Sequence, residues 1–127
     1  MSSLDRAMNG DVLVRHVTQD ERMIDQALLE RHGRSSRTLI KEGPLRLTIV
    51  ALAADGELAA HRAPGPATMH ILEGNIVFAV AGKNYDLTTG DILVMAAGVE
   101  HSARSPSGGV FLLTVVDLRP DKQEQTG

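Results

Sequence analysis

The chain has 127 residues, an apolar fraction of 43% and a formal net charge of −3, values that fit one ordinary globular domain. Acidic and basic residues are interspersed, so no nucleic-acid partner is expected, and the absence of cysteine excludes disulfides, thiolate–zinc sites and cysteine nucleophiles. The N-terminus lacks the features of a signal peptide, and no apolar run reaches the ~20 residues that span a bilayer. We therefore expect a soluble, cytoplasmic protein without a membrane partner.

The first third of the chain predicts one strand followed by one helix. Residues 11–17 (DVLVRHV) alternate in a pattern typical of a short strand. Thr18 and Glu21 form a capping-box pattern, and apolar residues then recur at helical spacing as far as Gly33, which is suited to a left-handed C-terminal position. These signals predict a single helix over about residues 19–32.

From residue 36 to about 118 the hydrophobic period changes to two. Runs of four to ten residues, among them ATMHILEG and NIVFAVAG, are separated by Gly, Pro, Asp or Asn, and each run predicts a separate short strand. Many short strands after one helix indicate an antiparallel sandwich or barrel and leave little room for crossover helices. We expect a mobile arm over residues 1–10, a single domain over 11–118 and a frayed tail over 119–127.

Two glycine-flanked segments carry histidines at a characteristic spacing. The first, GELAAHRAPGPATMHILEG, begins at Gly56, ends at Gly74 and contains His61. The second, GDILVMAAGVEHSARS, follows after fifteen residues and contains His101. The two segments resemble the cupin family motifs G-x5-H-x-H-x3,4-E-x6-G and G-x5-P-x-G-x2-H-x3-N, and the resemblance covers roughly residues 38–117.

The chain departs from the cupin pattern at two positions that hold a metal in the family. His61 and His101 stand on ligand positions, but Ala63 replaces the second histidine and Ala67 replaces the glutamate. In the second motif, Ser105 stands in place of the asparagine. The family's set of three histidines and one glutamate is thereby reduced to two histidines.

The resemblance implies an all-β fold, a double-stranded β-helix or jelly-roll cupin barrel with one short N-terminal helix. Because side chains on a strand alternate between its faces, residues of one parity would line the barrel interior. The expected cavity is aliphatic and contains two imidazoles. Its predicted residues are His61, Ala63, Ala67, Met69, Ile71, Val99, His101 and Ala103.

A divalent transition metal is one expected occupant of this cavity, held by His61 and His101 with His70 as a possible third ligand. His70 has the wrong parity for the interior unless a bulge beside Pro66 reverses it. Two histidines alone would bind a metal weakly, because catalytic zinc keeps three protein ligands and non-haem iron adds a carboxylate. The alternatives are that the histidines are structural, or that they orient an organic ligand in the neutral form that burial favours.

Other charged residues offer no clear site from the sequence alone. Glu73 and Glu100 are expected to face solvent. Arg34, Arg37 and Arg46 form no evident patch, although they would bind an anionic ligand if they gathered at the mouth of the cavity. No catalytic residue can be assigned.

Three functions remain open at this stage. The first is a cupin that binds a small molecule through His61 and His101. The second is a metal-dependent cupin enzyme of the isomerase or dioxygenase type, and the third is a non-catalytic sensing or interaction module. The resemblance also implies a homodimer, in which the predicted strand at residues 11–17 would cover the edge of a neighbour's sheet.

Overall fold

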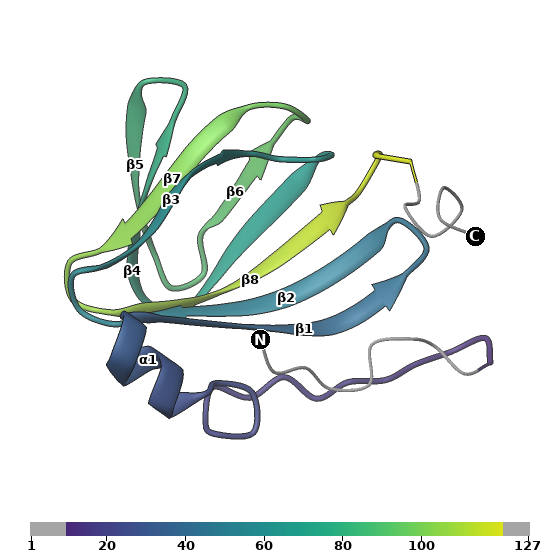
Figure 1. Cartoon of the computed structure of the whole chain (residues 1–127), viewed down its shortest axis with the longest axis horizontal. Helices are drawn as coiled ribbons and strands as arrows, with labels where there is room; N and C mark the ends of the chain where they lie inside the picture. The colour runs from purple at the N-terminus through teal and green to yellow at the C-terminus, as the bar shows by residue number, and fades with distance from the viewer. Residues whose placement is uncertain (1–9, 121–127) are drawn as a thin grey trace.

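The structure, a computed structural model, describes residues 10–120 and contains one helix and eight strands within that range (Figure 1). All the strand pairings are antiparallel, and the predicted all-β barrel with one short helix is confirmed. No helix among these residues is long and apolar enough to cross a membrane. The elements in chain order are α1 (Gln26–His32), β1 (Arg34–Glu42), β2 (Leu45–Leu52), β3 (Gly56–Arg62), β4 (Ala67–Val80), β5 (Lys83–Thr88), β6 (Ile92–Met95), β7 (Glu100–Ser105) and β8 (Gly109–Val116).

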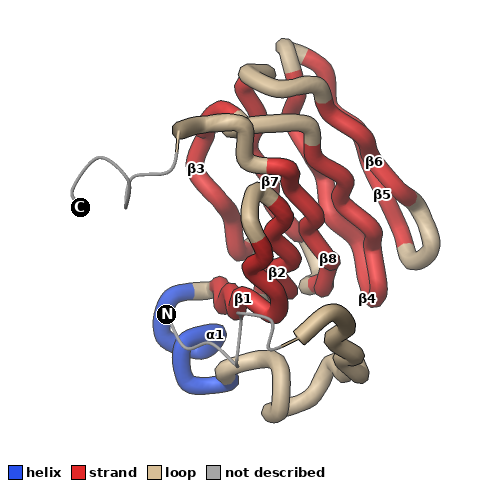
Figure 2. Tube along the Cα trace, turned by 90° about the vertical axis from the view of Figure 1, so that its right-hand side faces the viewer, coloured by secondary structure: helices blue, strands red, loops and turns tan. Residues whose placement is uncertain are grey.

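Strand β4 connects the two layers of the barrel (Figure 2). Residues 67–74 pair with β8, and β6 also pairs with this half, which gives a layer in the order β1-β2-β8-β4-β6. Residues 75–80 pair with β5 and β7, and β7 in turn pairs with β3. The prediction of two separate strands here is wrong, because residues 67–80 form one continuous bent strand.

The bend of β4 centres on Gly74, the glycine that closes the first motif. Gly74 has a φ of 77°, and a Cβ at this position would lie 2.2 Å from the carbonyl oxygen of Gly108. The pairing with β8 also shifts between Ile71 and Glu73, which marks a bulge. Only glycine tolerates both the left-handed conformation and the close approach, so backbone geometry explains this motif position.

Apolar residues fill the space between the layers and also cover one outer face. Inside, the rings of Phe78 and Phe111 meet edge-on with centroids 5.3 Å apart, a contact worth about 0.5–1.5 kcal/mol beyond the area it buries. Outside, Met23 and Ile24 belong to a second buried cluster that includes Leu39 of β1. The chain before α1 is therefore attached to the barrel by apolar packing.

The helix begins later than predicted. The predicted start at residue 19 is wrong, because Asp25 is the N-cap residue and its side chain accepts a hydrogen bond from a backbone amide of the first turn. The carboxylate of Asp20 accepts hydrogen bonds from the Thr18 hydroxyl and from a following amide, and such local bonds compete with helix formation. The predicted end at Gly33 is confirmed, with φ of 75°.

The strand predicted over residues 11–17 does not form in the structure of the single chain. Val12 and Val14 are 77% and 85% exposed, whereas Val17 packs against the outer cluster. Alternation produces a strand only where a neighbouring strand completes the backbone hydrogen bonds. The predictions for residues 1–10 and 119–127 lie almost entirely outside the described residues.

Candidate functional site

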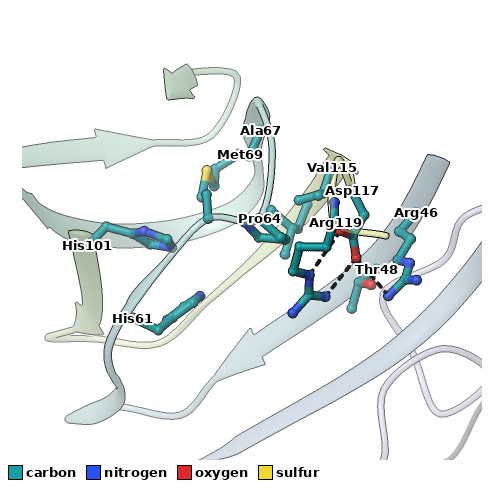
Figure 3. A pocket seen from close by; sticks show the side chains of 12 residues that line it. Arg46, Thr48, His61, Pro64, Ala67, Met69, His101, Val115, Asp117 and Arg119 are labelled. Atoms are coloured by element: carbon teal, nitrogen blue, oxygen red, sulfur yellow. Dashed lines mark hydrogen bonds and ion pairs between the residues drawn. The ribbon is translucent and has the colours of Figure 1, made fainter. Parts of the chain in front are cut away.

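His61 and His101 lie side by side on neighbouring strands. His61 belongs to β3 and His101 to β7, and the two residues are direct partners in the antiparallel ladder. Their ring centroids are 4.2 Å apart and the ring planes are inclined by 58°. The expectation that the motif histidines converge is confirmed. We refer to His61 and His101 as the histidine pair (Figure 3).

A bulge in β3 directs His61 toward the cavity. The pairing of β3 with β7 shifts between Leu58 and His61, so β3 has one more residue than β7 over this stretch. Leu58 packs against the interior core, and the extra residue allows His61 to face inward as well, although the two positions differ in parity. The register shift in β3 lies before His61 and not beside Pro66, where a bulge would have turned His70 inward.

Backbone carbonyls hold both imidazoles in the same tautomer. The Nδ1 atom of His61 lies 3.2 Å from the Ala59 oxygen, and that of His101 lies 3.1 Å from the Val99 oxygen. A carbonyl can only accept, so Nδ1 carries the proton in each neutral ring and Nε2 keeps a lone pair. In Figure 3 both rings extend toward the part of the cavity where Met69 lies. The pair can therefore offer two hydrogen-bond acceptors to a ligand.

The two histidines differ in their exposure to water. His101 is only 6% exposed, whereas His61 is among the exposed residues. Burial lowers the pKa of His101, and the nearby His61 lowers it further, against the opposing effect of the hydrogen bond to the Val99 carbonyl. At neutral pH the buried ring is consequently uncharged.

The cavity beside the histidine pair has a volume of about 170 Å³. Its walls come from the inner faces of both layers and include the predicted residues Ala63, Ala67 and Met69. Methyl groups thus occupy the two positions where the resembling family has a histidine and a glutamate. The full lining is Arg46, Thr48, His61, Ala63, Pro64, Ala67, Met69, His101, Leu113, Val115, Asp117 and Arg119.

Three other predicted cavity residues do not line this space. Ile71 and Ala103 are buried in the interior core at 0% and 5% exposure, and Val99 packs against the same cluster. Their inward direction agrees with the alternation, but neighbouring side chains separate them from the cavity. Parity alone predicts a face and does not predict where along that face the core is hollow.

His70 does not join the histidine pair. It alternates with Met69 along β4 and is paired with Ile92 and Leu112, which places it on the face opposite the cavity. Within residues 10–120 no three His, Cys, Asp or Glu side chains are grouped so that they could hold a metal ion. A third metal ligand at His70 therefore finds no support in this geometry.

Three charged residues outside both motifs also line the cavity, and we call Arg46, Asp117 and Arg119 the charged rim. Arg119 Nη2 lies 2.7 Å from Asp117 Oδ2, and Arg46 Nη1 lies 3.3 Å from the same oxygen. The Asp117 side chain is 6% exposed, against 39% for Arg46 and 55% for Arg119. Hydrogen bonds from Arg119, aided by the charge of Arg46, hold the pKa of Asp117 well below its usual range.

Backbone hydrogen bonds to two proline-containing loops position the segment that carries Asp117. The Asp117 amide donates to the Pro44 oxygen at 2.7 Å, and the amides on either side of it donate to the oxygens of Pro64 and Pro66, each at 3.1 Å. Gly65 lies so close to this segment that a Cβ would be 1.6 Å from one of its carbonyl oxygens. The APGPA loop therefore holds the rim in place through its backbone.

Comparison with known proteins identifies the family. Residues 48–117, more than half of the chain, match the family model described as "Cupin domain". The chain belongs to the cupin family. No curated protein matches its sequence.

Solved structures of other cupins share this fold. A conserved protein of unknown function from Streptococcus pyogenes is 25% identical, with 94% of this chain and 98% of that chain covered and a TM-score of 0.66. An RmlC-like cupin from Shewanella frigidimarina is 24% identical over 72% of this chain and 82% of its own, with a TM-score of 0.65. Salicylate 1,2-dioxygenase from Pseudoaminobacter salicylatoxidans is 19% identical over 76% of this chain and 31% of its own, with a TM-score of 0.67. These likenesses concern the fold.

The cupin motifs lead to the histidine pair but not to the charged rim. Of Arg34, Arg37 and Arg46, only Arg46 lines the cavity. A usable signal was present in β2, where Arg46 and Thr48 share one face of a strand that is otherwise apolar. No comparable signal marked Asp117 or Arg119, because their positions depend on loops that are distant in sequence. Glu73 and Glu100 are exposed, as expected.

Proposed function

We propose that this cupin binds a small organic molecule in the cavity and that the Nε2 atoms of His61 and His101 accept hydrogen bonds from it. The observation that carries the proposal is a pair of imidazoles in matched tautomers in the wall of a largely aliphatic cavity. Two imidazole acceptors that face the same cavity favour a ligand that carries a hydrogen-bond donor. The aliphatic walls would bind an apolar body.

The size of the cavity supports a ligand built on one ring or a short branched chain. Its volume of about 170 Å³ resembles that of an engineered apolar cavity of about 150 Å³, which holds benzene. A sugar nucleotide or a peptide would extend far beyond such a space. The proposal is therefore limited to molecules of about ten non-hydrogen atoms.

The residues present give less support to the hypothesis of a metal-dependent cupin enzyme. The histidine pair offers two nitrogen donors, and Ala63 and Ala67 stand where the family supplies the other two ligands. Catalytic zinc and non-haem iron sites require at least three protein ligands, so the donor set does not fit such a metal. A sensing module would use the same cavity without turnover, and we assign no catalytic residue.

Ligand binding can be tested with a library of ring-sized fragments and NMR spectra of methyl- and histidine-labelled protein. We expect fragments that shift the signals of Met69 and His101 together, and an affinity at least about tenfold lower in the double variant His61→Ala, His101→Gln. His70→Gln is the matched control, since His70 lies on the opposite face of β4. Affinity that is equal in the double variant and the wild type would contradict the proposal.

The metal content of the purified protein distinguishes a histidine pair that binds an organic ligand from one that binds a metal. Protein purified without chelator should contain less than about a tenth of an equivalent of iron, manganese, nickel, copper or zinc, and added metal should not raise the melting temperature, because a real site stabilises the folded state by mass action. A near-stoichiometric metal that disappears in the double variant would favour the metal-dependent enzyme instead.

We also propose a homodimer in the cytoplasm. Exposed apolar side chains support the dimer: Val12 and Val14 before the helix, and Ile92 and Val94 on β6, at 58% and 69% exposure. Burying such side chains against a second copy would remove apolar surface from water. Light scattering coupled to size exclusion should give twice the chain mass, and Val12→Asp with Val14→Asp should shift it toward the monomer. A wild-type protein that elutes as a monomer would contradict this.

A further inference from the structure

The charged rim carries more positive charge than its own carboxylate neutralises. Two guanidinium groups approach one carboxylate, and both approach the same oxygen of Asp117. Asp117 also accepts from the Nε atom of Arg119 at 3.0 Å through its other oxygen. The three side chains together therefore leave a surplus of one positive charge where the cavity meets solvent.

Several donors of the two guanidinium groups remain available. Each guanidinium has five N–H donors, and Asp117 engages two nitrogens of Arg119 and one nitrogen of Arg46. The Nε atom of Arg46 is buried without any hydrogen-bond partner. A buried donor without an acceptor is unfavourable, so a small rotation that brought it to a second carboxylate would be stabilising.

The remaining cavity lining has a different character. Apart from Thr48, which lies beside Arg46 and Asp117 in Figure 3, the rest of the lining is apolar and consists of Ala63, Pro64, Ala67, Met69, Leu113 and Val115. Figure 3 shows the rim at one end of the pocket and the histidine pair at the other. The cavity is thus cationic at one end and apolar in the middle, and it offers hydrogen-bond acceptors at the other end.

We propose that the ligand is a small monocarboxylate with an apolar body about the size of a benzene ring and a hydrogen-bond donor at its far end. This inference rests on the proposed function, because it assigns the chemical class of the ligand of the same cavity. The carboxylate binds Arg46 and Arg119, the body fills the aliphatic walls, and the distal hydroxyl or amine donates to the histidine pair.

The charge balance also selects against other anions. A monocarboxylate neutralises the single surplus charge of the rim. A phosphate or dicarboxylate would bring a second negative charge next to the buried Asp117 carboxylate, and like charges at such short range repel strongly where water is scarce. Inorganic phosphate and malonate therefore serve as probes that should bind poorly.

The test compares matched acids and amides on the wild-type protein. 4-Hydroxybenzoate and benzoate are titrated beside 4-hydroxybenzamide and benzamide by NMR, up to about 10 mM, a range that covers the weak affinities of such small molecules. We expect each acid to bind at least about tenfold more tightly than its amide. Raising the salt concentration should weaken binding of the acids and leave that of the amides unchanged.

Variants of the charged rim test whether Arg46 and Arg119 cause the preference for acids over amides. Arg46→Gln and Arg119→Gln should each reduce the preference for acid over amide, whereas Arg104→Gln, an exposed arginine on β7 outside the lining, should not. Asp117→Asn should tighten acid binding about tenfold because it removes the competing carboxylate, while a purely structural rim would give no gain.

The outcomes separate the two proposals. Equal binding of acids and amides that still depends on His61 and His101 would overturn the carboxylate inference and leave the proposed function intact. No binding of any of the four compounds would overturn the inference, and the fragment experiment would then decide the proposed function separately. Acid selectivity that survives in the Arg46→Gln, Arg119→Gln double variant would also overturn it.

Discussion

The histidine pair and the charged rim line the same cavity but are built in different ways. The histidine pair stands on two paired strands, and its register and bulge follow from strands that carry family motifs. The charged rim depends on Arg46 at the start of β2 and on a segment after β8 that is held by proline loops. His101 is uncharged at neutral pH, whereas Asp117 is ionised. The comparison shows that family motifs can mark one end of a site while the residues at the other end lie outside those motifs.

The largest expected effect comes from disturbing the loop that holds the rim. Gly65→Ala places a methyl group on a backbone carbonyl and should lower the free energy of unfolding by about 3 kcal/mol or more. Gly82→Ala is the matched control, since Gly82 has a φ of 82° but nothing within 4 Å of the added Cβ, and it should cost about 1–2 kcal/mol. Urea denaturation measures both. Equal losses would show that the close approach at Gly65 is not a constraint.

Breaking the ion pairs of the rim should have the next largest effect. Asp117→Asn should lower the free energy of unfolding by about 1–3 kcal/mol at pH 7. The pKa of Asp117 is depressed in the folded state, so its contribution is present above the ordinary value of 3.8 and is lost as pH falls through the folded value. Denaturation curves of the variant and wild type should therefore converge at low pH. A difference that persists there would contradict the assignment.

His101 should make the free energy of unfolding depend on pH at higher pH values than Asp117 does. The pKa of His101 is lowered below 6.5 on folding, so below that pH the unfolded chain binds more protons and the free energy of unfolding decreases. We expect this loss of stability at low pH to be smaller than the loss caused by Asp117→Asn. The variant His101→Gln should not show it. Urea denaturation at pH 7.5 and pH 5.5 tests this. Equal pH dependence in both proteins would show that His101 is not the group involved.

The smallest expected effect is the coupling within the histidine pair. His61 contributes to the lowered pKa of His101, though less than burial does. His61→Gln keeps much of the side-chain volume and removes the ionisable ring, so the pKa of His101 should rise modestly. An NMR titration of the His101 ring protons measures this shift, with His70→Gln as control. A decrease in the pKa would mean that the two rings do not interact as described.

The sequence predicted the barrel and the histidine pair well because both depend on local alternation and on motif spacing. Ala63, Ala67 and Met69, which the alternation predicts on the interior face, lie in the wall of the cavity. The prediction failed before residue 26, where local bonds of Asp20 replace helical ones. Asp117 and Arg119 were missed because only long-range contacts with the proline loops bring them to the cavity.

The central claim is that the imidazoles of His61 and His101 offer their Nε2 lone pairs to a ligand in one cavity. Long-range proton–nitrogen correlation spectra of histidine-labelled protein at pH 7.5 test it most directly, because they report the protonation of each ring nitrogen. We predict an unprotonated Nε2 in both His61 and His101, with both signals moving together when 4-hydroxybenzoate is added. A proton on Nε2 in either ring of the free protein would contradict the account. So would His61 and His101 signals that do not shift with any fragment.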